Sequence, residues 1–335
     1  MNILKRIKTY LILCRIQTTA VSALTPVFGA LAMGETQFSH LTLLFIYGIF
    51  AHIRGFVTNE YCDSEFDRAS PYTSSKPLAQ GSISKSAALL IIFISLFLSW
   101  LMVVVLFFNP VIVLIAFVHQ TLDTIYNLKG KKIIGLDTSL AASVFFLCLF
   151  GAFTVNTTLN PIVFYIATLG ALQVLFNNAI EGGLKDIESD YQFGAQTVAI
   201  ALGVRTQGEN LKIPLRFKLT AFIIKLAPLF FIYLILSSPM WELSHMKKFP
   251  ILALITILVT GMLFTLFRFL SLKKFQRENM KKIFSLHEIF TYSIVPLLFY
   301  PTVGIMGIFI LIFLPLLWYV SFNVLLYSKP FQPAV

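Results

Sequence analysis

The sequence predicts an all-α membrane protein, a polytopic bundle of nine or ten transmembrane helices that form one domain over residues 1–335. Three observations support this fold class. Hydrophobic residues make up 57% of the chain and charged residues only 12%. The mean hydropathy of +0.83 lies outside the range of soluble globular domains. Apolar stretches of about 20 residues, the length of a helix that crosses a bilayer, recur along the whole chain.

Ten apolar stretches are candidates for transmembrane helices. The first follows Lys5, Arg6 and Lys8. Because Arg15 and Gln17 interrupt it, we expect a retained helix and not a cleaved signal peptide. The ninth stretch is short and proline-interrupted, so nine helices would also fit. The predicted helices lie at 10–33, 40–58, 87–108, 110–127, 138–155, 159–180, 216–238, 249–271, 285–300 and 303–327.

Lysine and arginine residues predict the orientation of the chain. They gather before the first span and in the loops after the second, fourth, sixth and eighth spans, whereas the other loops are nearly bare apart from Lys247 and Lys248. We therefore expect the N-terminus and the even-numbered loops to face the cytoplasm, at the plasma membrane. The net charge of +11 follows from this topology. Because no soluble basic module is present, we expect no nucleic-acid partner.

Acidic residues are concentrated in two short windows. Clustered acids are costly near a bilayer, so their recurrence far apart in the sequence indicates a function. The windows fall in two predicted cytoplasmic loops, at about 59–86 and 181–217. Eight of the 15 acidic residues are involved: Glu60, Asp63, Glu65 and Asp67 in the first window, and Glu181, Asp186, Glu188 and Asp190 in the second.

The spacing within each window predicts a helical stripe of carboxylates. Asn59, Asp63 and Asp67 are four residues apart, and so are Asp186 and Asp190. Residues at this spacing share one face of a helix. Mg²⁺ prefers one or two carboxylates together with phosphate oxygens, so two such stripes would suit a diphosphate. A single pair would favour solvated loop residues that balance nearby lysines, but two pairs on one membrane side favour a metal site.

These motifs resemble those of the UbiA superfamily of intramembrane prenyltransferases. That family pairs an N-x-x-x-D-x-x-x-D loop after helix two with a D-x-x-x-D loop after helix six. The neighbouring runs at 76–81, 126–132 and 190–203 also resemble the family, and the resemblance extends from about residue 10 to residue 300. Two departures concern Glu60, where the family often has Asp, and Glu181 with Asn178, where many members have an upstream Asp.

The resemblance implies an Mg²⁺-dependent transfer of a polyprenyl group from a polyprenyl diphosphate to a lipophilic acceptor in the membrane. Asp63, Asp67, Asp186 and Asp190 would be the metal ligands and catalytic residues, with Asn59 assisting. Fixed cations stabilise charge that builds up on a leaving diphosphate. The candidates for that role are Arg68, Lys76, Lys129 and Lys131.

Each of these cations has a simpler interpretation. Arg68 could pair with the adjacent Asp67, and Lys131 could be an ordinary anchor at the membrane boundary. Tyr126 could shield an allylic cation through its ring face, although packing is the commoner role of an aromatic residue.

Further polar residues lie inside predicted spans. Arg54, above Asn59 in the second span, is expected to line a pocket, because an intramembrane arginine usually faces a cavity or a partner. Asp123 could line the acceptor pocket or form a structural hydrogen bond with His119, four residues away. Gly182 and Gly183 could break the helix so that Glu181 turns inward. Lys225, two turns into the seventh span, is expected to snorkel.

The acceptor and the reaction class have alternatives. A slight resemblance of the second motif favours an aromatic quinone precursor, while a glycerol-phosphate lipid, a haem, a chlorin or a carotenoid remain open. An intramembrane aspartyl protease would place two aspartates mid-helix and close together. A cation transporter would carry its acids near the bilayer midplane and would not need the adjacent lysines. The transferase is therefore favoured over both.

Overall fold

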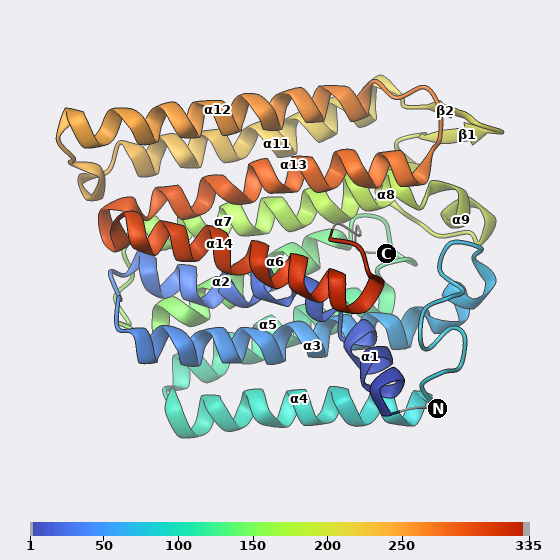
Figure 1. Ribbon diagram of the computed structural model, residues 1–335, viewed down its shortest axis with the longest axis horizontal. Helices are drawn as coiled ribbons and strands as arrows, with labels where there is room; N and C mark the ends of the chain where they lie inside the picture. Colours follow the sequence, from blue (N-terminus) through green and yellow to red (C-terminus); the bar gives the residue numbers. More distant parts are fainter. Residues whose placement is uncertain (1–2, 331–335) are drawn as a thin grey trace. The chain divides into compact units, whose positions relative to one another are not determined.

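The computed structural model describes residues 3–330 and shows an almost entirely helical chain (Figure 1). The first half contains α1 (Ile3–Leu13), a 3₁₀ turn η1 (Ile16–Thr18), α2 (Thr19–Ala32), α3 (Phe38–Ala69), α4 (Lys85–Leu106), α5 (Pro110–Lys129), α6 (Asp137–Phe153) and α7 (Pro161–Phe176). The second half contains the π-helix η2 (Asn177–Gly182), α8 (Gly183–Lys185), α9 (Ile187–Gln192), α10 (Val198–Ala201), β1 (Arg205–Gln207), β2 (Asn210–Lys212), α11 (Leu215–Leu236), η3 (Pro239–Trp241), α12 (His245–Leu270), α13 (Arg277–Leu298) and α14 (Tyr300–Tyr327).

The predicted all-α transmembrane class is confirmed. Within residues 3–330, seven helices are long and apolar enough to cross a membrane, and the bent pair of Ile3–Leu13 and Ile16–Ala32 makes an eighth. The fifth and ninth predicted spans fall on α6 and α13, which are not among these eight. α6 has only 17 residues. α13 begins with a polar turn that includes Arg277 and Glu278.

The described chain falls into two compact units. The first comprises residues 3–129, 142–163 and 313–330, and the second comprises residues 130–141 and 164–312. The first acidic motif belongs to the first unit and the second motif to the second unit.

Small residues allow close helix packing in the first unit, where α3 packs against α2, α4 and α5. A Cβ atom at Gly48 would lie 2.4 Å from the carbonyl oxygen of Ala23, and one at Gly151 would lie 1.8 Å from that of Pro26. Such contacts are typical of membrane helices, whose association depends on close packing. They hold α3, which carries the first motif, against its neighbours.

The first span is broken at Arg15. This residue has left-handed backbone angles (φ 45°, ψ 44°), and the two halves of the span meet at a bend of 53°. The ring of His52 on α3 holds the break, because its Nε2 lies 3.2 Å from the Arg15 carbonyl oxygen and its Nδ1 lies 2.5 Å from Ser22 Oγ. The bend places the Arg15 side chain next to the first motif.

The second unit has an apolar core made by α7, the second motif region and α11 to α13. Buried Phe176, Phe217, Phe269 and Met280 belong to this core. α12 and α13 are antiparallel neighbours (Figure 1). The β1–β2 hairpin is joined to the loop between them, since Leu211 N donates to the Lys273 carbonyl oxygen at 2.8 Å.

Candidate functional site

The first motif lies on the last turns of α3, with its residues on one face as the spacing predicts. Asn59 Nδ2 donates a hydrogen bond to Asp63 Oδ2 at 3.4 Å. Asp67 is only 3% exposed, although it lies near the end of the helix. A buried carboxylate requires compensating positive charge.

Lys76 supplies that charge for Asp67. Its Nζ lies 2.8 Å from Asp67 Oδ2 and 3.5 Å from Glu60 Oε1. Glu60 is also buried, and its Oε1 accepts a hydrogen bond from Arg15 Nη2 at 3.0 Å. Two cations and two carboxylates therefore form one network. Glu60 and Arg15 were not predicted as site residues.

Arg68 has a different partner from the one that its sequence position suggested. Its Nε donates to the carbonyl oxygen of Ala79 at 3.0 Å. Ala79 belongs to the Lys76–Gly81 run, so Arg68 ties this loop to the end of α3. Asp67 is paired with Lys76 rather than with Arg68.

Arg54 and Asp123 form a buried ion pair between α3 and α5. Arg54 Nη2 lies 2.9 Å from Asp123 Oδ2, and Arg54 Nη1 donates to Thr124 Oγ1 at 3.3 Å. Asn127 Nδ2 donates to Asp123 Oδ2 at 3.3 Å. Within the described residues, Arg54 Nε has no hydrogen-bond partner although it is buried. An unpaired buried N–H is costly, which makes this atom a candidate for binding a ligand.

His119, Tyr126 and Lys129 are the other candidate residues on α5. His119 is hydrogen-bonded to Ser143 and not to Asp123, with Nδ1 at 2.8 Å from Ser143 Oγ. Tyr126 is half-buried on the last turns of α5, and Lys129 is exposed at its end.

The second motif follows a π-helical turn at the end of α7. Backbone hydrogen bonds join Asp186 N to the Gly182 carbonyl oxygen at 3.0 Å and Asp190 N to that of Asp186 at 2.9 Å. Each four-residue step of the second motif therefore corresponds to one helical turn of the backbone. Glu181 lies on the π-helix and is buried, with Oε1 lacking a hydrogen-bond partner within residues 3–330. π-Helical turns occur frequently at functional sites.

Asp186 is surrounded by cations. Arg277 Nη2, from the first turn of α13, lies 2.9 Å from Asp186 Oδ1, and Lys185 Nζ lies 3.5 Å from Oδ2. Burial tends to raise the pKa of Asp186, but the charges of Lys185, Arg277 and Lys131 and the Arg277 hydrogen bond lower that pKa to about 2. The carboxylate is therefore ionised at any physiological pH. Arg277 was missed in the sequence, where only the polar start of its helix marks it.

Lys225 fixes the start of the π-helix. It is 1% exposed, its Nζ donates to Gln173 Oε1 at 2.7 Å, and it lies 4.4 Å from the centre of the Phe176 ring. Gln173 Nε2 in turn donates to Asn177 Oδ1 at 2.6 Å. The expectation that Lys225 snorkels is therefore wrong, because its amine is held inside the unit.

The carboxylates of each motif suit a cation that completes its shell with other ligands. Across residues 3–330, no three Asp, Glu, His or Cys side chains are grouped closely enough to hold a metal ion. Mg²⁺ does not need such a group, because it binds through one or two carboxylates plus water and substrate phosphate. The hard oxygen ligands of both motifs fit Mg²⁺.

Comparison with known proteins gives one family and one fold. The UbiA prenyltransferase family profile matches residues 23–294. Over 203 residues the chain is 30% identical to a digeranylgeranylglyceryl phosphate synthase of Methanoregula boonei, covering 59% of this chain and 70% of that protein. Over 208 residues it is 26% identical to a 4-hydroxybenzoate octaprenyltransferase of Francisella tularensis, covering 59% and 71%.

Solved structures share the fold. A UbiA homologue from Aeropyrum pernix K1 superposes with a TM-score of 0.67 at 15% identity, covering 87% of this chain and 99% of that one. A homologue from Archaeoglobus fulgidus, bound to GPP and Mg²⁺, gives 0.60 at 16% identity, covering 91% and 99%. With the family profile matching most of its length and apolar helices throughout, the chain belongs to the UbiA prenyltransferase family and is an integral membrane prenyltransferase.

Proposed function

We propose that this protein transfers a polyprenyl group from an isoprenyl diphosphate to a lipophilic acceptor within the membrane, in a reaction that requires Mg²⁺. Family membership supports this reaction class. The single observation that carries the proposal is the pair of acidic motifs, each with a buried or partly buried aspartate held by a cation: Asp67 by Lys76 and Asp186 by Arg277. Such carboxylates are fixed in position before any ligand binds.

Asp63, Asp67, Asp186 and Asp190 are the proposed Mg²⁺ ligands. Asn59 orients Asp63 through its hydrogen bond. When bound, Mg²⁺ neutralises negative charge on a diphosphate and so makes it a better leaving group. The same ion is present with GPP in the Archaeoglobus fulgidus homologue.

Basic side chains next to the motifs complete the binding of the diphosphate. Lys76 and Lys131 each lie near a motif aspartate, and Arg68 and Lys129 are further candidates. Fixed cations in place before the reaction stabilise the charge that develops on the leaving oxygen. The C1–O bond breaks with its electron pair on the diphosphate, the acceptor forms the new bond to C1, and the acceptor releases a proton. Tyr126 is the proposed aromatic shield for the positive charge at C1.

The acceptor is proposed to carry an acid group. Arg54 is buried, and its Nε has no hydrogen-bond partner within residues 3–330, which favours a carboxylate or phosphate ligand. Asp123 holds the guanidinium through Nη2, and Glu181 is a further candidate for contact with substrate. An aromatic quinone precursor is the first candidate acceptor. A glycerol-phosphate lipid is the second, favoured by the relative from Methanoregula boonei.

We further propose that the chain acts as one domain, with the loops at about 59–86 and 181–217 on the cytoplasmic side of the plasma membrane. The excess of lysine and arginine in these loops supports this orientation. A cysteine introduced at exposed Ser74 should react with a membrane-impermeant maleimide in inverted vesicles and not in intact cells. The reverse labelling pattern would contradict the orientation.

An acceptor panel tests the proposed reaction. Purified protein is given radiolabelled geranylgeranyl diphosphate, Mg²⁺ and one acceptor at a time: 4-hydroxybenzoate, geranylgeranylglyceryl phosphate or a phenol without an acid group. We expect extractable labelled product with one of the acidic acceptors, and none after EDTA treatment. No transfer to any acceptor, together with no Mg²⁺-dependent binding of the diphosphate, would contradict the proposal and favour a cation transporter.

A further inference from the structure

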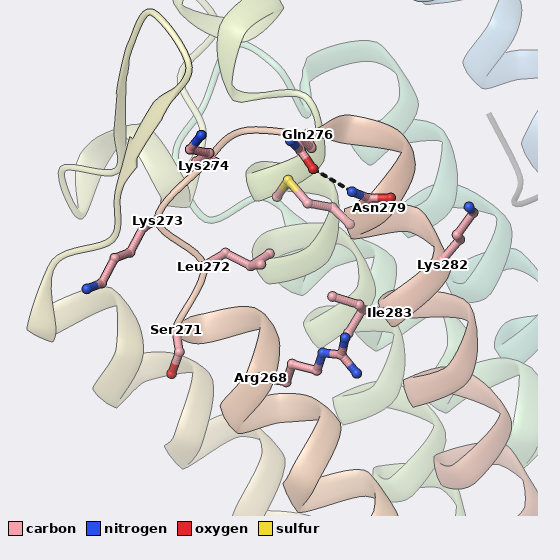
Figure 2. A pocket seen from close by; sticks show the side chains of 10 residues that line it. Arg268, Ser271, Leu272, Lys273, Lys274, Gln276, Asn279, Lys282 and Ile283 are labelled. Atoms are coloured by element: carbon pink, nitrogen blue, oxygen red, sulfur yellow. Dashed lines mark hydrogen bonds between the residues drawn. The ribbon is translucent and has the colours of Figure 1, made fainter.

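The loop between α12 and α13 borders a pocket that lies apart from both acidic motifs in sequence. The pocket has a volume of about 520 Å³ and is lined by the last turn of α12, the loop at 271–276 and the first turns of α13 (Figure 2). Its lining combines cationic and apolar side chains. The cations are Arg268, Lys273, Lys274 and Lys282, and the apolar residues are Leu272, Met280 and Ile283.

Arg268 belongs to the last turn of α12. In Figure 2 its guanidinium lies beside Ile283, with Gln276 and Asn279 across the pocket from it. Lys274 has a distant acidic partner, Glu209, at 4.0 Å. Arg268 and Lys282 have no carboxylate within ion-pair distance in the part of the chain that the structure describes. A concave surface with uncompensated positive charge attracts an anion.

The pocket continues into an apolar surface along both helices. Thr265 Oγ1 and His287 Nδ1 lie 2.8 Å apart, and a Cβ atom at Gly261 would lie 2.9 Å from the Phe290 ring. This antiparallel register places Phe264 close to the level of Leu286, one turn beyond the pocket. Phe264 is 63% exposed and Leu286 is 44% exposed. They share helix faces with Arg268 and Lys282, which are each four residues away.

We propose that this pocket binds the phosphate headgroup of an anionic phospholipid, with the acyl chains lying over Phe264 and Leu286. The candidate span Met246–Leu270 ends at the pocket, so the cations lie at the level of lipid headgroups. Basic pockets between transmembrane helices bind anionic headgroups, and juxtamembrane cations add to the attraction. A free phosphate ester would share the polar contacts but would leave the apolar surface unused. The combination of both surfaces therefore favours a lipid.

Thermal unfolding of the purified full-length protein in a neutral detergent tests the proposal. A ligand that binds only the folded state stabilises it by RT ln(1 + [L]/Kd), so the unfolding midpoint rises with the logarithm of the ligand concentration above Kd. Short-chain phosphatidylglycerol should raise the midpoint in this way, phosphatidylcholine of the same chain length should not, and glycerol 3-phosphate should act only at much higher concentration. Equal shifts with both lipids would overturn the proposal. Equal potency of glycerol 3-phosphate would assign the pocket to free phosphate esters and also overturn it.

Variants that each remove one positive charge test where the lipid binds. Arg268→Gln should weaken phosphatidylglycerol binding about tenfold, which corresponds to about 1.4 kcal/mol. Lys282→Gln should weaken it in the same direction and serves if Arg268→Gln does not fold. Lys247→Gln removes the same charge from the other end of α12 and should leave the affinity unchanged. Unaltered affinity in the two pocket variants, or an equal loss in the control, would overturn the proposal.

Discussion

Lys76 is the residue on which the first motif depends most. It pairs with buried Asp67 at 2.8 Å and with Glu60 at 3.5 Å, and Arg15 shares Glu60 from the opposite side. Burying a carboxylate without a partner would cost several kcal/mol, on the order of 3–5 when one member of a buried pair is removed. Lys76 therefore has a structural task as well as its proposed role in binding diphosphate, and a test must separate the two.

Lys76→Met should raise the KM for prenyl diphosphate about tenfold, equivalent to about 1.4 kcal/mol, and change the KM for the acceptor much less. The reason is that a fixed cation interacts with the diphosphate and not with the acceptor. Steady-state kinetics with each substrate varied in turn provide the measurement. Lys85→Met is the matched control, because Lys85 forms its ion pair with exposed Glu65 in the same region. Equal increases in both KM values would mean that Lys76 is merely structural.

Lys185 and Arg277 together lower the pKa of Asp186 in the second motif, against the effect of burial. The depressed pKa of about 2 means that the stabilisation from this carboxylate is complete above its ordinary value of about 3.9, and is lost as the pH falls through about 2. Arg277→Met removes one charge and one hydrogen bond, so the pKa of Asp186 should rise, although Lys185 and Lys131 remain. The stabilisation from this carboxylate should then be smaller and be lost at a higher pH than in the wild type.

The unfolding midpoint of both proteins, measured at a series of pH values from about 2 to 6, checks this shift. Lys212→Met, an exposed lysine on β2, is the control for loss of a positive charge in the same unit. The unfolding midpoint of Arg277→Met should also fall, because an ionic hydrogen bond is worth about 1.5–3 kcal/mol. Superimposable pH profiles of the variant and the wild type would refute the assignment of Arg277.

The sequence predicted the aspartates of the site better than their partners. Asn59, Asp63 and Asp67 share a helical face because their spacing equals one turn. Arg15 and Arg277 lie 45 and 91 residues from the carboxylates that they contact, and no local pattern reports such pairs. Glu60 departs from the family motif, yet its carboxylate contacts both Arg15 and Lys76.

At the scale of elements, the sequence indicated that the helix is interrupted before the second motif, but it did not identify the π-helix η2. Gly182 and Gly183 indicated a break, and the structure has an extra-wide turn that continues into α8. Its start is fixed by Lys225 through Gln173, 52 residues away in the sequence. A lysine inside an apolar span was therefore a packing residue, which hydropathy alone does not reveal.

Lys225→Met should lower the unfolding midpoint, because Gln173 Oε1 loses its hydrogen-bond donor inside the second unit. An unsatisfied buried acceptor costs about 1–3 kcal/mol, whereas replacing both partners by apolar groups is nearly neutral. The double variant Lys225→Met/Gln173→Leu should therefore recover part of the lost stability in a thermal unfolding assay, since it also removes the Gln173 hydrogen bond to Asn177. Lys218→Met, on the first turn of the same helix, is the control. A double variant as unstable as the single one would disprove this role of Lys225.

At the scale of the whole molecule, the fold class followed from apolar stretches long enough to span a bilayer. Each predicted span after the first falls on a helix, and the first falls on the bent pair of helices, because the cost of unpaired backbone groups in lipid leaves few other structures open to such a stretch. The ends of the spans were less predictable. α13 continues through Pro296, while α14 is broken at Gly304 (φ 64°).

The central claim is that the aspartates of both acidic motifs are required for Mg²⁺-dependent prenyl transfer. The most direct measurement is the rate of prenyl transfer by purified Asp63→Ala and Asp190→Ala, one variant from each motif, beside Glu65→Ala as an acidic control from the first window. We predict that both aspartate variants insert into the membrane normally and lose at least about a hundredfold in rate, a loss typical for removal of an electrostatic catalytic group. EDTA should abolish transfer by the wild type, and Glu65→Ala should remain active. Full activity in either aspartate variant would contradict the account.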